Sequence, residues 1–189
     1  MIVTAATTNP GKLAELAALL APALEIRPAP NDYKAPEETG RSYLENARLK
    51  ARALFGRTGA AALADDSGLE VEALGGAPGL GSARFGVDAE SRISRLLAEL
   101  AGRDRRARFR TALVLVLANG RELAAEGDCE GEIVSDSRGG SGFGYDPVFL
   151  VPSFGRTLAE LTNEEKNRVS ARGAAARALL ATFARYEAP

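Results

Sequence analysis

Residues 109–134 read FRTALVLVLANGRELAAEGDCEGEIV, and this stretch decides which class of fold the chain adopts. Asn119-Gly120 stands between two runs with strand character, residues 109–118 and 122–134. An Asn-Gly pair in this position is a strong signal of a β-hairpin, because the favoured two-residue turn needs positive φ at both central residues. The stretch therefore predicts two neighbouring strands joined by a tight turn.

The segments on both sides of this hairpin switch between strand and helix periodicity. Strand patterns cover residues 2–6, 24–27, 60–65 and 147–151, and helical spacing covers residues 13–20, 42–55, 89–100 and most of the chain after 160. Glycine-rich loops are expected at 66–86 and 135–145. Because strands and helices are mixed, with no repeat and no linker-like boundary, we predict a single α/β domain over residues 1–189.

Composition narrows the function classes. The 189 residues are 46% hydrophobic and 26% charged, which is typical of a globular domain with a real core. The formal net charge is −1. Proteins that bind the phosphate backbone of DNA or RNA usually carry a basic excess, so we expect no nucleic-acid partner.

The sequence contains no histidine, and Cys129 is its only cysteine. Catalysis by a Ser-His-Asp or Cys-His arrangement is therefore excluded, as are an intrachain disulfide and a cysteine-based zinc site. Proton transfer must fall to carboxylates, lysine, tyrosine or metal-bound water. Any metal held by side chains would have oxygen ligands, which favours magnesium, manganese or calcium.

Targeting signals are not apparent at the start of the chain. The N-terminal residues MIVTAATTNPGK lack a basic region ahead of an apolar core, and the longest uninterrupted apolar run covers only residues 112–118. Such a run is far too short to cross a bilayer. We therefore expect a cytoplasmic protein that has no membrane partner.

The segment Thr7-Thr8-Asn9-Pro10-Gly11-Lys12 lies between a predicted buried strand and a predicted helix. A helix start offers free backbone N–H groups and the positive end of the helix dipole, which suit a phosphate group. Lys12 adds a positive charge, and the preceding polar side chains add hydrogen bonds. The alternative interpretation is an ordinary strand-to-helix turn, since the sequence is not a Walker A motif.

A pair of adjacent carboxylates, Asp65-Asp66, ends the predicted strand at 60–65 and precedes Ser67-Gly68. Successive strand residues point to opposite faces, so the two acids are not expected to face one site. An acid at a strand end can hold a hard cation and orient a water molecule. The alternative is a polar turn, because Asp, Ser and Gly all favour turns.

Three further segments carry groups suited to a nucleotide. Lys50 and Asn46 are spaced to share one helix face, and the loop at 139–147 combines glycines with aromatic rings and Asp146. Lys166 and Arg172 would meet the same anion only if the helix breaks near Ser170 or if the ligand sits at a helix end. Taken singly, each segment has a plain structural alternative, namely a solvated helix surface or a flexible loop.

Together and in order, five segments resemble the inosine/xanthosine triphosphate pyrophosphatase family. They are TTNPGK (7–12), EETGRSYLENARLKA (37–51), LADDSGLEVEALGGAPG (63–79), GGSGFGYDPVF (139–149) and AELTNEEKNRVSARG (159–173). The resemblance implies a magnesium-dependent hydrolase that converts non-standard purine nucleoside triphosphates (ITP, dITP and XTP) to the monophosphate and pyrophosphate. It also implies an elongated mixed-sheet α/β domain with two lobes around a central nucleotide-binding cleft, and a homodimer.

The resemblance further implies a role for each matching residue. Asp66 would be the general base and a magnesium ligand, and Glu37 would be a second metal ligand. The residues that would bind substrate are Thr7, Thr8, Asn9, Pro10, Gly11, Lys12, Lys50, Ser67, Phe143, Gly144, Tyr145, Asp146, Lys166, Ala171 and Arg172.

One position departs from the family pattern. Ala171 stands where the last family motif, Ser-His-Arg, has its histidine, so one polar contact to the base is expected to be missing. We predict broader base selectivity with intact chemistry. Two alternatives stay open: a purine nucleotide-binding sensor without catalysis, and a related pyrophosphatase that acts on pyrimidine or modified nucleotides.

Overall fold

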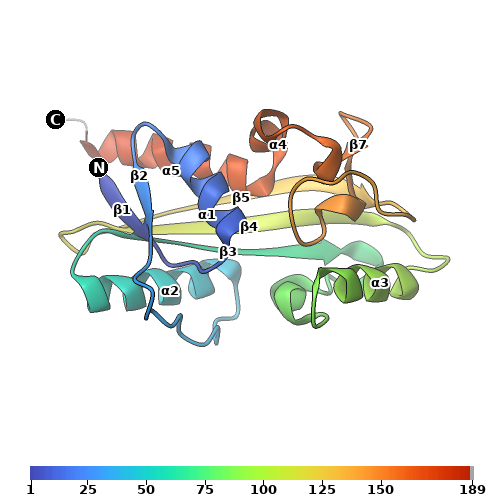
Figure 1. Cartoon of the computed structure of the whole chain (residues 1–189), viewed down its shortest axis with the longest axis horizontal. Helices are drawn as coiled ribbons and strands as arrows, with labels where there is room; N and C mark the ends of the chain where they lie inside the picture. The colour runs from blue at the N-terminus through green and yellow to red at the C-terminus, as the bar shows by residue number, and fades with distance from the viewer. Residues whose placement is uncertain (188–189) are drawn as a thin grey trace. The chain divides into compact units, whose positions relative to one another are not determined.

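The computed structural model describes residues 1–187, which form a seven-stranded mixed sheet with helices (Figure 1). The sheet order is β2-β1-β3-β4-β5-β6-β7, with β1 parallel to β2 and β3, and β6 antiparallel to β5 and β7. The strands are β1 Ile2–Ala5, β2 Glu25–Pro28, β3 Ala62–Val71, β4 Arg106–Val116, β5 Glu122–Ile133, β6 Phe149–Val151 and β7 Arg156–Thr157. The predicted α/β class is confirmed.

Five α-helices and four short 3₁₀ helices accompany the sheet in the described part of the chain. The α-helices are α1 Pro10–Leu20, α2 Tyr43–Thr58, α3 Ala89–Glu99, α4 Asn163–Val169 and α5 Ala171–Glu187, and the 3₁₀ helices are η1 Glu72–Leu74, η2 Gly79–Arg84, η3 Asp146–Val148 and η4 Leu158–Glu160. Within the described residues, no helix has the length and the run of apolar residues that crossing a membrane requires.

The predicted hairpin is present: β4 and β5 are neighbours in the sheet, and the N–H of Leu117 donates to the carbonyl of Arg121 at 2.8 Å. Gly120 has φ +82°, a conformation that glycine adopts without strain. The expected strand at 60–65 is longer than predicted, because β3 continues to Val71 through the proposed loop. Its pairing and burial in the sheet override the local turn preference of Ser67-Gly68.

The chain divides into two compact units, each with its own apolar core. Unit 1 comprises residues 1–66, 111–127 and 172 onward, and unit 2 comprises residues 67–110 and 128–171. That residues 1–189 form one domain stays a prediction. The nucleotide-binding cleft implied by the resemblance also stays a prediction.

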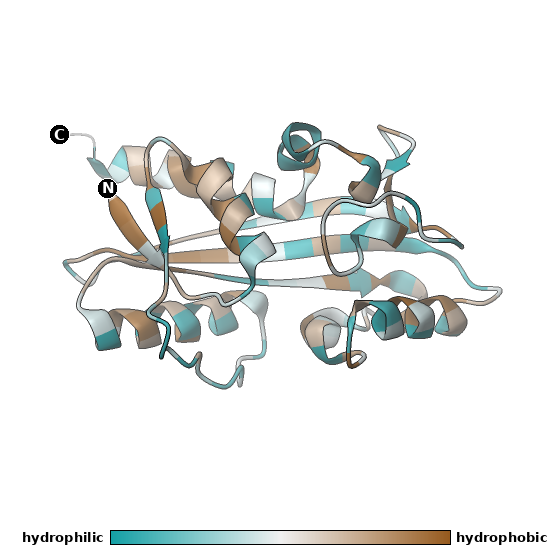
Figure 2. Cartoon of the chain, in the orientation of Figure 1, coloured by the Kyte–Doolittle hydropathy of each residue, from teal (hydrophilic) through white to brown (hydrophobic). Residues whose placement is uncertain are grey.

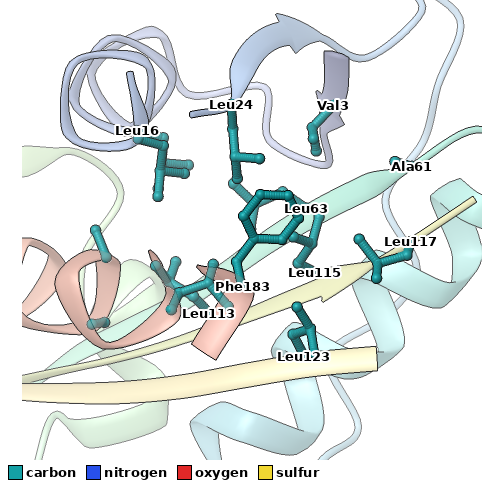
Figure 3. Close-up of a cluster of buried hydrophobic side chains, with 14 residues drawn as sticks. Val3, Leu16, Leu24, Ala61, Leu63, Leu113, Leu115, Leu117, Leu123 and Phe183 are labelled. Carbon is teal, nitrogen blue, oxygen red and sulfur yellow. The ribbon is translucent and has the colours of Figure 1, made fainter. Parts of the chain in front are cut away.

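In unit 1, helices α1 and α5 lie on one side of the sheet and α2 lies on the other (Figure 1). Leu16 and Leu20 of α1 and Phe183 of α5 pack with strand residues, among them Leu63 and Leu115 (Figure 3). Leu16, Leu20 and Leu63 are completely buried, as the helical apolar spacing of α1 predicts. This packing holds the start of α1 close to the end of β1.

In unit 2, helix α3 carries hydrophilic and hydrophobic residues side by side (Figure 2). Its Leu96, together with Leu100, is completely buried, whereas Arg95 and Glu99 form an exposed ion pair at 2.8 Å. Tyr145 and Phe149 belong to the same apolar core. The glycine-rich loop that precedes Tyr145 is therefore anchored at its end.

Candidate functional site

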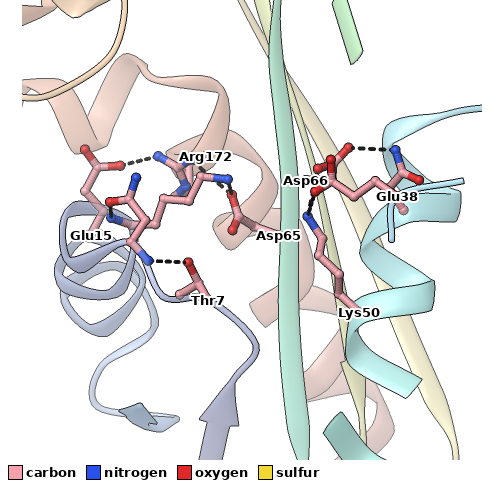
Figure 4. A network of polar contacts seen from close by, with 10 residues as sticks. Thr7, Glu15, Glu38, Lys50, Asp65, Asp66 and Arg172 are labelled. Atoms are coloured by element: carbon pink, nitrogen blue, oxygen red, sulfur yellow. Dashed lines mark hydrogen bonds and ion pairs between the residues drawn. The ribbon is translucent and has the colours of Figure 1, made fainter. Parts of the chain in front are cut away.

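Asp65 and Asp66, adjacent on β3, are buried and point in opposite directions (Figure 4). The alternation of side chains along a strand requires this, and the prediction that the two acids face different ways is confirmed. Asp65 lies among residues of α1 and α5, and Asp66 lies among residues of α2 and the loop before it. All of these groups belong to unit 1.

Asp65 is the centre of a buried charge cluster. Its Oδ2 atom lies 2.9 Å from Lys12 Nζ and accepts a hydrogen bond from Arg172 Nη2 at 3.1 Å. Arg172 also donates to the carboxylate of Glu15 on α1. Burial alone would raise the pKa of Asp65, but the charges of Lys12 and Arg172 outweigh it and hold that pKa well below its ordinary value. Asp65 is therefore a permanent anion.

Asp66 has different surroundings. Lys50 Nζ lies 2.8 Å from Asp66 Oδ1 and 2.9 Å from Glu38 Oε1, and Asn46 Nδ2 donates to Asp66 Oδ2 at 3.3 Å. Burial raises the pKa of Asp66, with a further contribution from the negative charge of Glu38, although Lys50 opposes both. A carboxylate with a raised pKa is a better proton acceptor than an ordinary one.

The start of α1 is a strand-to-helix turn capped by Asn9. Asn9 is the N-cap and its Oδ1 accepts from the backbone N–H of Lys12 at 3.1 Å, while its own N–H donates to Thr7 Oγ1 at 3.2 Å. Pro10 fills the first helical position, where the missing N–H costs nothing. Thr8 is exposed and Gly11 is partly exposed. The strand, turn and helix predicted here are confirmed, whereas phosphate binding stays a prediction.

A second group of predicted residues meets in unit 2. Asp146 Oδ2 lies 2.6 Å from Lys166 Nζ and accepts from the backbone N–H of Phe143 at 2.7 Å. The same lysine Nζ lies 4.9 Å from the centre of the Phe143 ring. A cation, a carboxylate and an aromatic face are thus gathered at one point, which suits a flat heteroaromatic ring.

Tyr145 faces the interior of unit 2. It is buried, its hydroxyl donates to the carbonyl of Ser82 at 3.0 Å, and burial raises its pKa to about 12. Of the two aromatic rings in this loop, the ring of Phe143 is the more accessible.

A pocket of about 560 Å³ lies between α3 and the glycine-rich loop, and Ile93, Leu97 and Phe143 line part of it. Gly142 in this loop has φ +78°, and a Cβ there would come within 2.2 Å of Asp146 Oδ2. Glycine is required at this position because a side chain would displace the Asp146 carboxylate.

The helix of the C-terminal motif breaks at Ser170, one of the two conditions under which Lys166 and Arg172 could meet the same anion. Helix α4 ends at Val169, Ser170 is extended with ψ 153°, and α5 begins at Ala171. Ala171 is 3% exposed and packs in the apolar core of unit 2. Ser67, on β3, is partly exposed.

The structure adds residues that the sequence reasoning did not assign. Glu38, rather than the exposed Glu37, pairs with Lys50 beside Asp66, while Glu15 pairs with Arg172. The only signal in the sequence for Glu15 was its position three residues after Lys12, a spacing that places both side chains on one helix face. The sequence could not show whether Glu37 or Glu38 faces Lys50 and Asp66, because side chains in a loop have no fixed periodicity. Metal binding by Glu37 stays a prediction.

Comparisons with known proteins identify the relatives of this chain. The model of the Ham1 family matches residues 3–182. A dITP/XTP pyrophosphatase of Gloeobacter violaceus is 54% identical over 183 residues, covering 95% of this chain and 93% of that protein. A protein of the same name from Thermus thermophilus is 48% identical, covering 97% and 92%.

Solved structures with the same fold include a HAM1 protein from Coxiella burnetii, with a TM-score of 0.87 and 39% identity over 98% of this chain and 99% of that one. A nucleoside-triphosphatase / dITP/XTP pyrophosphatase from Mycobacterium abscessus is 43% identical, with a TM-score of 0.72 and coverage of 97% and 99%.

Proposed function

This chain belongs to the Ham1 family, and from that membership we propose that it is a nucleoside triphosphate pyrophosphatase. Its substrates are non-standard purine nucleoside triphosphates, ITP, dITP and XTP, and its products are the monophosphate and pyrophosphate. The observation that carries the chemistry is geometric: Asp65 pairs with Lys12 and Arg172 on one face of β3, whereas Asp66 lies beside the Lys50–Glu38 pair on the other. In keeping with these surroundings, the pKa of Asp65 is lowered and that of Asp66 is raised. Neighbouring carboxyl groups with opposite shifts are typical of divided roles in catalysis.

Asp66 is the general base of the reaction. It accepts a proton from water, the water oxygen bonds to phosphorus, and the bond between the α- and β-phosphoryl groups breaks to release pyrophosphate. With no histidine in the chain, a carboxylate with a raised pKa is the natural group for this step. Lys50 lies 2.8 Å away and holds the Asp66 carboxylate in place.

The triphosphate is bound by cations and backbone donors of unit 1. Residues Thr7–Lys12 surround the start of α1, where the positive end of the helix dipole attracts an anion. Lys12 and Lys50 supply positive charge that offsets the charge of the phosphates.

The donor set beside Asp66 fits a divalent metal. Glu38 and Asp66 both reach the single Lys50 ammonium, so two carboxylates already surround one centre of positive charge. Two carboxylates suit Mg²⁺, an ion that usually takes one or two carboxylates together with substrate phosphates. When bound, the ion would neutralise phosphate charge and acidify water.

Glu38→Gln is therefore expected to reduce activity about 10–100-fold and to raise the magnesium concentration needed for half-maximal rate. Glu37→Gln, the adjacent change of the same kind, is the matched control and is expected to have a small effect, because Glu37 is exposed. Magnesium titrations of both variants measure this. A larger defect in Glu37→Gln than in Glu38→Gln would return the ligand role to Glu37.

The purine is held by residues of unit 2. The ring of Phe143 offers a stacking face, and Asp146 and Lys166 offer polar contacts close to it. A 6-oxo purine presents an acceptor to backbone N–H donors, whereas adenine presents an amino group and leaves such a donor unpaired, at a cost of about 1–3 kcal/mol. Ser67, Gly144, Tyr145, Ala171 and Arg172 complete the proposed binding set.

Base selectivity is expected to be modest, because the methyl group of Ala171 cannot form a hydrogen bond to the base. Discrimination between ITP and GTP should stay below about 10⁴-fold, the level that fully hydrogen-bonded pockets reach. Values of kcat/KM for ITP, dITP, XTP and GTP, measured side by side, test this. A ratio at or above that level would show that another residue replaces the missing contact.

A magnesium-dependent assay of pyrophosphate release, run over standard and deaminated nucleoside triphosphates, tests the proposed function itself. Release from dITP and XTP with EDTA-sensitive kinetics supports it. Tight nucleotide binding without release would favour a sensor, and a preference for pyrimidine or modified nucleotides would favour a related pyrophosphatase. We further propose a homodimer, which light scattering tests, and a cytoplasmic location, where the nucleotide precursors are found.

A further inference from the structure

Asn46, on the first turn of α2, contacts Asp66, one of the two carboxylates proposed to hold the metal, and the loop that carries Glu38, the other. Its side-chain Nδ2 donates to Asp66 Oδ2 at 3.3 Å, and its Oδ1 accepts from the backbone N–H of Gly40 at 2.8 Å. Gly40 lies two residues after Glu38 in the chain. One amide group therefore connects the loop that carries Glu38 with the strand that carries Asp66.

The orientation of this amide is determined by its surroundings. The N–H of Gly40 is a donor only, so it must face the oxygen of the amide, and the NH₂ group is then the side that faces Asp66. Asn46 is 2% exposed, so water does not compete for either bond. A buried amide with both ends paired resists rotation, because turning it would leave two buried groups unsatisfied.

The contact with Gly40 also explains why the loop approaches α2 so closely. A Cβ on Gly40 would lie 2.6 Å from Asn46 Oδ1 and 2.7 Å from Glu45 Cβ. Both distances are shorter than atoms tolerate, so any side chain at this position would push the loop and the amide apart. The close approach is thus specific to glycine, and it brings Glu38 within 2.9 Å of Lys50 Nζ.

The Asp66 carboxylate is held at both of its oxygens, Oδ1 by Lys50 and Oδ2 by Asn46. Lys50 also binds Glu38, but an ammonium on a flexible stem can follow either carboxylate. The short, buried Asn46 side chain cannot move in this way. It is the part of the cluster that sets how far apart the two carboxylates lie.

We propose that Asn46 is a positioning residue that holds Asp66 and Glu38 at the separation needed to bind one divalent metal with the substrate phosphates. It touches neither metal nor substrate. This inference rests on the proposed function, because it assigns Asn46 to the site of the pyrophosphatase reaction. Groups that orient metal ligands typically change metal affinity or activity about 10–100-fold when removed.

Two variants on different segments remove the same contact. Asn46→Ala deletes the amide, and Gly40→Ala leaves it in the chain but displaces it. Ser42→Ala is the matched control: Ser42 Oγ caps α2 by accepting from the N–H of Glu45 at 3.1 Å, so its loss weakens the same helix without touching Asp66. A purely structural effect on α2 would appear in all three variants.

Two readouts test the proposal. The first is the Kd of a non-hydrolysable inosine triphosphate analogue, measured once with Mn²⁺ and once with EDTA. The Kd in EDTA divided by the Kd in Mn²⁺ gives the metal-dependent gain in affinity. The second is kcat and KM for dITP. Asn46→Ala and Gly40→Ala are each expected to reduce the metal-dependent gain and kcat about 10–100-fold, with the Kd in EDTA unchanged. Ser42→Ala is expected to retain the wild-type metal-dependent gain, Kd in EDTA, kcat and KM.

The outcomes separate the inference from the function on which it rests. If the wild-type protein releases no pyrophosphate from any nucleotide, the proposed function fails. If it does release pyrophosphate, a wild-type metal-dependent gain in both variants overturns the role of Asn46. The role of Asn46 is also overturned if the wild type shows no metal-dependent gain in affinity. The same holds if Ser42→Ala loses as much of that gain as Asn46→Ala and Gly40→Ala do. Should Asn46→Ala fail to fold, Gly40→Ala decides.

Discussion

Replacement of Asp66 by Asn is expected to reduce kcat about 10²–10⁴-fold, which is the range that a general base contributes. The amide has the shape of the carboxylate but accepts no proton from water at neutral pH. Its environment prepares Asp66 for this role, because burial and the negative charge of Glu38 raise its pKa. Pyrophosphate release from dITP, followed at saturating magnesium, measures the loss.

Nucleotide binding should survive the same change. Lys12 keeps its ion pair with Asp65 and Lys50 keeps its contact with Glu38, so the proposed phosphate contacts remain in place. Calorimetric titrations with dITP in EDTA, where the metal that Asp66 would also hold is absent, should therefore give Asp66→Asn a Kd within a few-fold of the wild-type Kd. Asp32→Asn, an exposed acid paired with Arg57, is the control and should leave both rate and binding unchanged.

Near-normal turnover in Asp66→Asn would contradict the assignment of the base. Asp65 would be the next candidate by position, but its ion pairs with Lys12 and Arg172 make it a poor proton acceptor. A carboxylate outside this pair would then have to be considered, beginning with Glu38, which shares Lys50 with Asp66.

The second large effect is expected on stability. Asp65→Asn removes the buried carboxylate that two cations share, the partly buried Lys12 at 2.9 Å and the buried Arg172 at 3.1 Å. Breaking a buried ion pair by removing one partner typically costs about 3–5 kcal/mol, because the remaining charge stays buried without full compensation. The midpoint of thermal unfolding should fall by about 6–20 °C for a chain of this size. Differential scanning calorimetry measures both quantities.

The loss should depend on pH in a defined direction. The pKa of Asp65 is lowered in the folded state, so its contribution to the free energy of unfolding is complete above the unfolded-state value of 3.8. That contribution is lost as the pH falls and the carboxylate is protonated. The difference in stability between the wild type and Asp65→Asn should therefore be largest at neutral pH and narrow below about pH 4.

Asp32→Asn serves again as the control for stability, because its exposed ion pair with Arg57 should contribute less than about 1 kcal/mol. If the two variants lose equal amounts of stability, the Asp65 cluster is not the buried network described above. A constant difference between the wild type and Asp65→Asn from pH 3 to pH 7 would contradict the lowered pKa.

Features governed by neighbours in the chain were accessible from the sequence. Asn119-Gly120 predicted the hairpin because turn geometry depends on two residues, and helical spacing over residues 42–55 predicted α2 because it depends on residues three or four apart. The opposite directions of Asp65 and Asp66 followed from strand alternation alone. Local rules such as these need no knowledge of the rest of the fold.

Features that depend on distant partners were missed or misplaced. The strand β3 continues through Ser67-Gly68 because sheet pairing overrides local turn preference. Glu38 could not be distinguished from Glu37, since its contact with Lys50 depends on how one loop folds back over α2. The pairing of Glu15 with Arg172, 157 residues later in the chain, had no pattern that could reveal it.

The sequence by itself determined the class of fold, the family, and the set of residues from which the chemistry is drawn, because composition, periodicity and short motifs carry that information. The tertiary structure alone decided the surroundings of the two neighbouring acids. Asp65 faces Lys12 and Arg172, which lower its pKa, and Asp66 faces Glu38 in a buried site where its pKa is raised. The physical reason is that a pKa depends on burial and on charges a few ångströms away, and those are supplied by segments far apart in the chain.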